Sequence, residues 1–136
     1  MRAPDTSVLI AGFDSSHVFH ETAQEALSTV RRRGRLIAHT VAETFAVLTA
    51  AGPYHVPPAR VDQYLDRFLD RAPIGLEPAC YARAVAELSD NAITGGAVYD
   101  GLIALGARWA GATLLSLDRR AGATYHRLGV EVELLL

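Results

Sequence analysis

The sequence predicts an α/β domain with a mostly parallel central sheet. Short apolar segments rich in β-branched residues alternate along the chain with longer segments in which apolar residues recur at helical spacing. Glycine and proline lie between these segments. The 136 residues are 50% hydrophobic and 21% charged, which suits a chain that buries one proper core. Sheets of this class bind ligands at the carboxyl ends of their strands, so the residues that follow each strand are of most interest.

The first half of the chain is expected to hold two strands and three helices. Residues 6–13 are apolar and β-branched and are taken as the first strand. Asp14, Ser15 and Ser16 offer N-caps for a helix that extends to about residue 33, where Gly34 closes it. A short strand is predicted over residues 36–39, followed by a helix over about 41–51. After Pro57 and Pro58, a further helix is predicted over about 59–71.

The second half continues the alternation. Helices are predicted over about residues 78–89, 97–109 and 121–128, with a loop at 91–96. Strands are predicted over residues 113–117 and 130–134. There is no internal repeat, low-complexity tract or linker, so we expect residues 1–136 to form a single domain.

The composition excludes several kinds of chemistry. All 13 basic residues are arginine, so a Walker-type phosphate loop and Schiff-base catalysis, which both need lysine, are ruled out. Cys80 is the only cysteine, so neither an internal disulfide nor a cysteine metal cluster can form. No apolar run approaches the ~20 residues of a membrane span. Asp5 lies where the apolar segment of a secretion signal would begin, and we expect a cytoplasmic, soluble protein that does not associate with membranes.

The charge distribution by itself does not indicate a nucleic-acid-binding protein. The net charge is −2, whereas such proteins usually have a basic excess. Arg31, Arg32, Arg33 and Arg35 form a local cluster, but a run of charges is more often a solvated helix face. Trp109 and the tyrosines are expected in the core or in interfaces rather than as base-stacking platforms.

Four acidic residues lie in apolar surroundings or directly next to predicted elements. They are Asp5, Glu43, Asp100 and Asp118. Each has a structural alternative: Asp5 could be a surface residue, and Glu43 could close a capping box with Thr40. Asp100 could complement a helix dipole, and Asp118 could start a turn or cap a helix. Strand ends and helix starts at one edge of a parallel sheet would nevertheless bring all four into one pocket.

Four carboxylates without lysine or a suitable cysteine or histidine set make an all-oxygen site. His17 and His20 are spaced like metal ligands, but no third ligand is evident near them. Oxygen ligands suit hard cations, so Mg²⁺ is expected, with Mn²⁺ as a substitute. Such ions stabilise the attacking and leaving oxygens of an in-line displacement at phosphorus. The residues therefore favour metal-assisted hydrolysis of a phosphodiester.

Five segments, in order and over nearly the whole chain, resemble the motifs of PIN domains. The segment Asp5-Thr6-Ser7-Val8-Leu9-Ile10-Ala11 looks like their opening motif, and Ser16-His17-Val18-Phe19-His20-Glu21-Thr22-Ala23 resembles the start of their first helix. The segment Val41-Ala42-Glu43-Thr44-Phe45 is similar to that of their helical glutamate. Tyr99-Asp100-Gly101-Leu102-Ile103-Ala104 and Leu115-Ser116-Leu117-Asp118-Arg119-Arg120 resemble their third and fourth acidic motifs. The length fits the VapC toxins of bacterial toxin–antitoxin pairs.

This resemblance implies a three-layer α/β/α sandwich and a Mg²⁺-dependent ribonuclease. Asp5 and Asp100 would be the main metal ligands, and Glu43 and Asp118 would complete the site directly or through water. Thr6, Ser7 or Ser116 could support ligands or position water. The resemblance also implies a VapB-type antitoxin whose C-terminal segment covers the acidic pocket, an RNA substrate, and a homodimer.

Two other functions remain to be weighed. A PIN-like module could bind RNA or protein without cutting it, although such a module would be expected to lack one of the acids. A receiver-like or haloacid-dehalogenase-like enzyme would need a second acid two residues after Asp5, where Ser7 stands, and a lysine.

One departure from the PIN pattern is Pro4, because proline is disfavoured in the central strand that normally precedes the first aspartate.

Overall fold

A computed structural model describes residues 1–136 and contains a small, wholly parallel sheet. Its strands are β1 (Arg2–Pro4), β2 (Thr113–Ser116) and β3 (Val132–Leu134), in the order β1-β2-β3. The helices are α1 (Thr6–Phe13), α2 (His20–Arg33), α3 (Ala38–Thr49), α4 (Pro58–Asp66), α5 (Tyr81–Asp90), α6 (Ala97–Trp109) and α7 (Arg119–Arg127), with a 3₁₀ turn η1 (Pro78–Cys80) before α5. No helix is both long enough and apolar enough to span a bilayer.

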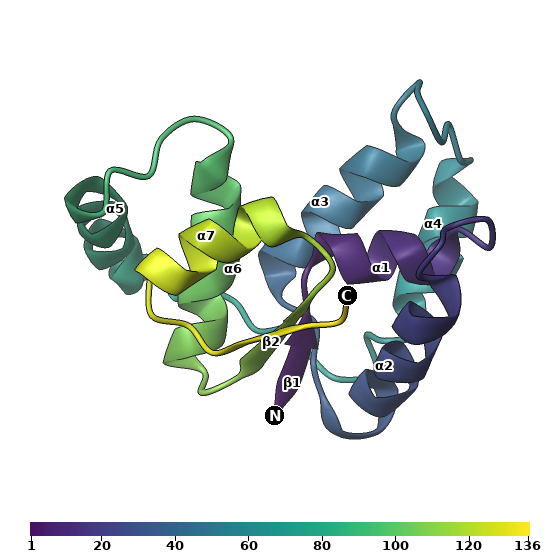
Figure 1. Cartoon of the computed structure of the whole chain (residues 1–136), viewed down its shortest axis with the longest axis horizontal. Coiled ribbons are helices and arrows are strands. Elements are labelled where there is room, and N and C mark those ends of the chain that lie inside the picture. Colours follow the sequence, from purple (N-terminus) through teal and green to yellow (C-terminus); the bar gives the residue numbers. More distant parts are fainter.

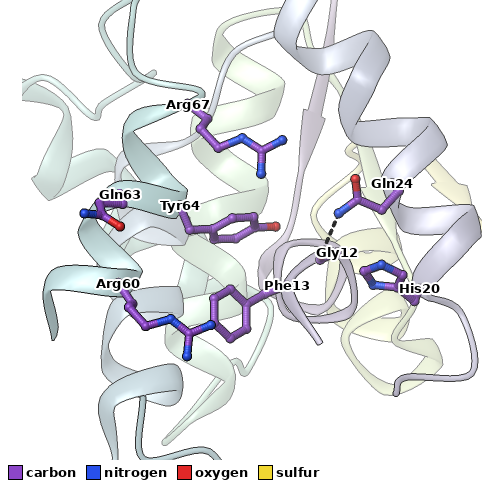
Figure 2. A pocket seen from close by; sticks show the side chains of 8 residues that line it. All are labelled: Gly12, Phe13, His20, Gln24, Arg60, Gln63, Tyr64 and Arg67. Atoms are coloured by element: carbon purple, nitrogen blue, oxygen red, sulfur yellow. Dashed lines mark hydrogen bonds between the residues drawn. The ribbon is translucent and has the colours of Figure 1, made fainter. Parts of the chain in front are cut away.

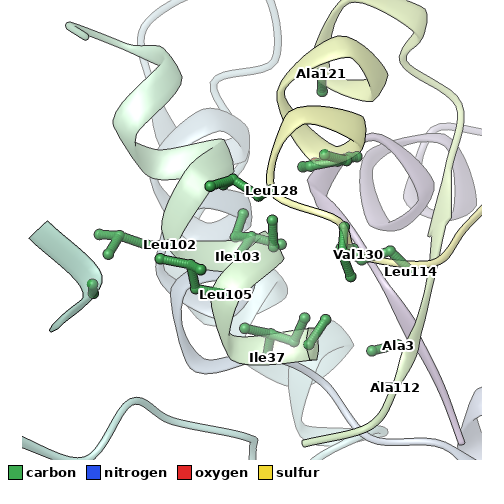
Figure 3. Close-up of a cluster of buried hydrophobic side chains, with 14 of the residues drawn as sticks. Ala3, Ile37, Leu102, Ile103, Leu105, Ala112, Leu114, Ala121, Leu128 and Val130 are labelled. Carbon is green, nitrogen blue, oxygen red and sulfur yellow. The ribbon is translucent and has the colours of Figure 1, made fainter. Parts of the chain in front are cut away.

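The helices form a layer on each face of the sheet, which confirms the expected α/β/α arrangement. Helices α5, α6 and α7 lie on one side and α1 to α4 on the other (Figure 1). Successive residues of a strand point to opposite faces, so Leu114 of β2 joins the hydrophobic cluster under α6 and α7. Its neighbour Leu115 joins a second cluster, formed with α1, α2 and α4. Figure 3 shows the first cluster, in which Ile103 of α6 points toward Val130 and Leu114, while Leu102 lies on the other side of the helix.

The prediction of a strand over residues 6–13 is wrong, because this segment is helix α1. Asp5 caps the helix: its side chain accepts a hydrogen bond from the Val8 amide. Helix α1 is apolar on nearly all sides because it is buried, with Val8, Leu9 and Ala11 fully covered. A short apolar run that is buried all round lacks the one-sided periodicity that separates helix from strand.

The strand that precedes Asp5 is β1, and it tolerates Pro4 because of its position in the sheet. The Asp5 amide donates to the Leu115 carbonyl of β2 at 2.9 Å, whereas the Arg2 carbonyl accepts from Arg35 on the opposite side. Backbone groups two residues apart in a strand point the same way, so the Pro4 nitrogen faces away from β2. The missing N–H therefore costs no ladder hydrogen bond with β2.

The predicted strand over residues 36–39 is reduced to a single bridge between Ile37 and Ile74, and helix α3 begins at Ala38. Ile37 is the residue before the helix, and no side chain caps this helix start. Thr40 is therefore a fully buried interior residue, and Glu43 lies in the second turn of α3 rather than the first. The capping-box interpretation of Glu43 is wrong for this reason.

Most other elements agree with the prediction apart from their ends. Helix α6 has the predicted bounds, and β2 and β3 lie within the predicted strands. Helix α2 begins at His20 rather than near Ser16, because Asp14 forms a local turn in which its carboxylate accepts from the Ser16 amide. Helix α4 ends at Asp66, earlier than predicted. Gly34 closes α2 as expected, and a Cβ there would lie 2.3 Å from the Arg2 carbonyl oxygen of β1.

Candidate active site

The four predicted acids lie where strands end or helices begin, with one exception. Asp5 joins β1 to α1, and Asp118 joins β2 to α7. Because β1 and β2 are parallel neighbours, their carboxyl ends meet at one edge of the sheet. Asp100 lies in the first turn of α6, and Glu43, the exception, lies one turn into α3. Helices α3 and α6 pack against each other.

Asp5 is the fixed centre of this region and is only 2% exposed. Its Oδ1 accepts hydrogen bonds from Ser7 Oγ at 2.5 Å and from the Val8 amide at 3.3 Å. Its Oδ2 accepts from Ser116 Oγ and, at 3.0 Å, from the Tyr125 hydroxyl. Burial raises the pKa of Asp5 above its usual value, and the bonds from Ser116, Ser7 and Tyr125 oppose that rise. Asp5 is thus not the surface residue that one alternative proposed.

Two serines tie the end of β2 to the start of α1 through Asp5. Ser7 Oγ, which donates to Asp5, also accepts from the Leu117 amide at 2.8 Å. Ser116 Oγ likewise donates to Asp5 and accepts from the Asp118 amide at 3.0 Å. Each hydroxyl uses its donor and an acceptor site, so both rotamers are locked. Ser7 and Ser116, which were expected from the sequence to support ligands or position water, both donate hydrogen bonds to Asp5.

Tyr125 of α7 was not identified from the sequence as a site residue. It is fully buried, and its hydroxyl reaches Asp5 Oδ2 across 120 residues of chain. Burial and the nearby charge of Asp5 both raise its pKa, so the phenol stays protonated and acts as a donor. A tyrosine on an amphipathic helix gives no sequence signal for this role, because the contact exists only after α7 packs on the sheet edge.

Asp100 shows that the four carboxylates share one electrostatic environment. Its pKa is raised to about 6, first by burial and then by the negative charges of Glu43, Asp118 and Asp5. The three negative charges that raise the pKa of Asp100 favour a cation beside it. Asp100 is thus the acid on which the charges of the other three act.

Asp118 and Glu43 differ in what else they do. Asp118 Oδ1 caps helix α7 by accepting from the Arg120 amide at 2.8 Å and the Ala121 amide at 3.3 Å. The capping interpretation of Asp118 is therefore correct, and it leaves Oδ2 without a partner in the protein. Glu43 is half-buried and neither caps a helix nor accepts a hydrogen bond from another protein group.

The donor set consists of carboxylate and hydroxyl oxygens, the type of ligand that hard divalent cations prefer. No three histidine, cysteine, aspartate or glutamate side chains are grouped so that they could hold a metal ion, and His17 and His20 belong to no such group. Magnesium commonly uses one or two carboxylates and keeps several waters, so an open arrangement of acids suits it. The buried Thr6 Oγ1, next to Asp5, has no hydrogen-bond partner within the protein.

A second, basic pocket of about 340 Å³ lies between α1, α2 and α4 (Figure 2). Arg60 of α4 and Arg67, which directly follows α4, lie across the pocket from His20 and Gln24 of α2. The rest of the lining consists of Gly12, Phe13, Gln63 and Tyr64. The guanidinium of Arg60 lies 5.7 Å from the centre of the Phe13 ring. The His20 ring bonds to the Ala11 carbonyl, which holds it in the wall.

Comparison with known proteins identifies the family. The model of the PIN domain matches residues 3–126. The chain belongs to the PIN-domain family. This PIN-domain chain is 45% identical to "Ribonuclease VapC40" of Mycobacterium tuberculosis over 136 residues, which is 99% of each protein. It is 37% identical to "Ribonuclease VapC27" of the same species over 133 residues, which is 96% of this chain and 93% of that one. The predicted resemblance to VapC-type PIN domains is confirmed.

Solved structures agree with this PIN fold. The chain matches a structure of FitAB bound to IR36 DNA fragment with a TM-score of 0.71 and 22% identity, covering 99% of this chain and 95% of that one. It matches FitAcB from Neisseria gonorrhoeae with a TM-score of 0.70 and 21% identity, covering 99% and 98%. At these identities the likeness concerns the fold alone.

Proposed function

We propose that this PIN-domain protein is an endoribonuclease toxin of a VapBC-type toxin–antitoxin pair, which hydrolyses RNA phosphodiester bonds with Mg²⁺ at Asp5, Glu43, Asp100 and Asp118. The observation on which the proposal chiefly depends is the position of the acids in the fold. Asp5 and Asp118 follow two neighbouring parallel strands, Asp100 lies in the first turn of α6, and Glu43 lies in α3, which packs against α6. Full-length relatives at 45% identity that bear the name ribonuclease support it. Mn²⁺ is expected to substitute for Mg²⁺, since both prefer oxygen ligands.

The chain's own residues have distinct tasks in this proposal. Asp5 and Asp100 would hold the cation, and Glu43 and Asp118 would contribute directly or through water. When bound, the cation supplies Lewis-acid polarisation of the scissile phosphate. Ser7, Ser116 and Tyr125 fix the Asp5 carboxylate, so that no reorientation is needed when RNA binds. The free Glu43 carboxylate is available to accept a proton from an attacking water.

The test is cleavage of total cellular RNA by the purified protein. We expect cutting with Mg²⁺ or Mn²⁺, none with EDTA, and none by Asp100→Asn. Asp62→Asn, which changes an exposed carboxylate on α4, is the matched control and should cut like the wild type. If folded, antitoxin-free protein fails to cut a broad RNA panel with either metal, the nuclease proposal is wrong, and a PIN-like module that binds RNA or protein without cutting takes its place.

The proposed partner is a VapB-type antitoxin. Four clustered carboxylates attract a basic side chain, so the antitoxin's C-terminal segment would place an arginine or lysine there and cover the site. Co-expression with the neighbouring short reading frame should yield a complex that does not cut RNA. A complex that forms but retains full cutting would contradict this mode of inhibition.

We further propose that the protein is a homodimer. Several apolar side chains are exposed on the surface; among them are Phe45 and Val47 of α3 and Tyr81 and Val85 of α5. Light scattering during size-exclusion chromatography should give twice the mass of 14.6 kDa. A single monomer mass at micromolar concentration would contradict the proposal.

A further inference from the structure

An apolar pocket of about 320 Å³ lies beside the carboxylates, between α3 and α6. His39, Ala42, Glu43 and Ala46 of α3 form one wall, and Tyr99 of α6 forms the other. The α3 residues are spaced i, i+3, i+4 and i+7, so they form one stripe along the helix. Two of the four residues are alanines, whose short side chains leave room in the pocket for a flat group.

Tyr99 is the unusual member of this pocket. Its side chain is 59% exposed, although it stands in a helix whose following residues, Gly101 to Ala107, are all buried. The Tyr99 hydroxyl makes no hydrogen bond within the protein, and its ring stacks on no other ring. The tyrosines were expected in the core or in interfaces; Tyr64 and Tyr125 lie in the core, whereas Tyr99 is exposed.

We propose that this pocket receives the base of a nucleotide next to the scissile phosphate, with the base stacked on the Tyr99 ring. The inference depends on the proposed function and specifies part of its substrate site. The pocket and the carboxylate cluster share Glu43, and Tyr99 directly precedes Asp100, so an occupant of the pocket adjoins the reacting group. No arginine lines the pocket, so it suits a base rather than a phosphate.

The chemistry of the walls fits a base better than an aliphatic side chain. Stacking on an aromatic ring is available to every base, because each has a π-face. The alanines provide apolar contact, and the His39 ring offers a polar atom to a base edge. Tyr99 would act as a residue that positions substrate, while the carboxylates do the chemistry.

The experiment uses a short RNA that the wild-type protein is first shown to cut. Tyr99→Ala should raise KM by about 5- to 150-fold, as loss of one stacked base does, with kcat changed much less. Tyr99→Phe keeps the ring and should stay within about twofold of the wild type. Ala46→Leu should narrow the pocket and also raise KM. Val18→Ala, which shortens an exposed apolar side chain before α2, is the control and should not change KM.

Abasic substrates make the test specific. Removing the base at one position beside the cut should raise the wild-type KM as much as Tyr99→Ala does, and the two changes combined should be no worse than either alone. Additive effects, or an unchanged KM for Tyr99→Ala, would overturn the inference. An unchanged KM together with loss of antitoxin binding or of the dimer would assign the pocket to a protein partner. If the wild-type protein cuts no RNA, the proposed nuclease function is wrong, and the inference about the Tyr99 pocket is wrong with it.

Discussion

The carboxylate cluster and the basic pocket of Figure 2 are built in different ways. In the cluster, Asp5 and Asp118 sit at strand-to-helix junctions and bond to backbone amides, so the fold itself fixes them. In the basic pocket, Arg60 of α4 and Arg67, which directly follows α4, are long, exposed side chains. Arg60 lies over the ring of Phe13, and neither guanidinium bonds to a backbone amide. The carboxylate cluster is therefore the region suited to chemistry that needs fixed side-chain positions. In the basic pocket only the buried part of the lining, around Gly12 and Tyr64, is rigid.

The largest expected effect is a difference in RNA cleavage between a variant of the carboxylate cluster and a variant of the basic pocket. Glu43→Gln removes a charge from the cluster without removing a hydrogen bond and should lower the rate of RNA cleavage by about 100-fold or more. Arg67→Gln removes a charge from the basic pocket and should leave kcat within about threefold. Steady-state cleavage of one short RNA measures both. Equal losses in the two variants would show that the regions act as one site.

The next largest expected effect concerns the packing around Gly12, which lines the basic pocket. A Cβ added at Gly12 would lie 2.3 Å from Leu27 Cδ1 and 2.9 Å from the Tyr64 hydroxyl oxygen, both in buried side chains. Gly12→Ala should therefore lower the free energy of unfolding by about 1–3 kcal/mol. Gly122→Ala on α7 meets no atom within 4 Å and should stabilise the protein by up to about 1 kcal/mol. Urea unfolding compares them, and equal values would contradict the packing argument.

Ser116→Ala should have a somewhat smaller effect on stability. It removes one donor to Asp5 Oδ2, while the Tyr125 bond to the same oxygen remains. We expect the free energy of unfolding to fall by about 1–2 kcal/mol. Ser28→Ala, on the exposed face of α2 beside the arginines, should change it by less than about 0.5 kcal/mol. A neutral Ser116→Ala would mean that the Asp5 network does not hold the sheet edge together.

The smallest expected effect is a pH dependence of the metal-free protein. Asp100 has a pKa of about 6 in the folded state against 3.8 for the unperturbed group, so between these values the folded protein binds more protons than the unfolded chain. Stability should therefore fall as pH rises from about 4 to about 6. Asp100 is half-buried, and solvent screening limits the loss to about 1 kcal/mol.

Urea titrations in EDTA at several pH values measure this dependence. Asp100→Asn should flatten the decline, whereas the matched change Asp62→Asn should leave it as in the wild type. Saturating Mg²⁺ should add stability at pH 7 in the wild type, by about 2.7 kcal/mol at 100 times its Kd, and less in Asp100→Asn. A decline of the same size in Asp100→Asn would assign it to other groups.

The sequence by itself determined the fold class, most helices and the identity of the four acids. Helix α6 was predicted closely because its apolar segment is longer than a strand, and Gly34 because a helix-ending glycine is a local signal. The carboxylates stood out because acids in apolar segments are rare and costly. The VapC-type resemblance followed from five motifs in order, and the matching PIN-domain model confirmed it.

Tertiary structure alone decided three other matters. Helix α1 was taken for a strand, because burial on all sides erases the periodicity that would reveal a helix. The Ser7, Ser116 and Tyr125 bonds to Asp5 join residues up to 120 positions apart, so no local pattern could announce them. The Tyr99 pocket exists only because α3 and α6 pack side by side. Sequence fixes which groups are available, and their distances are set by packing between elements that are remote along the chain.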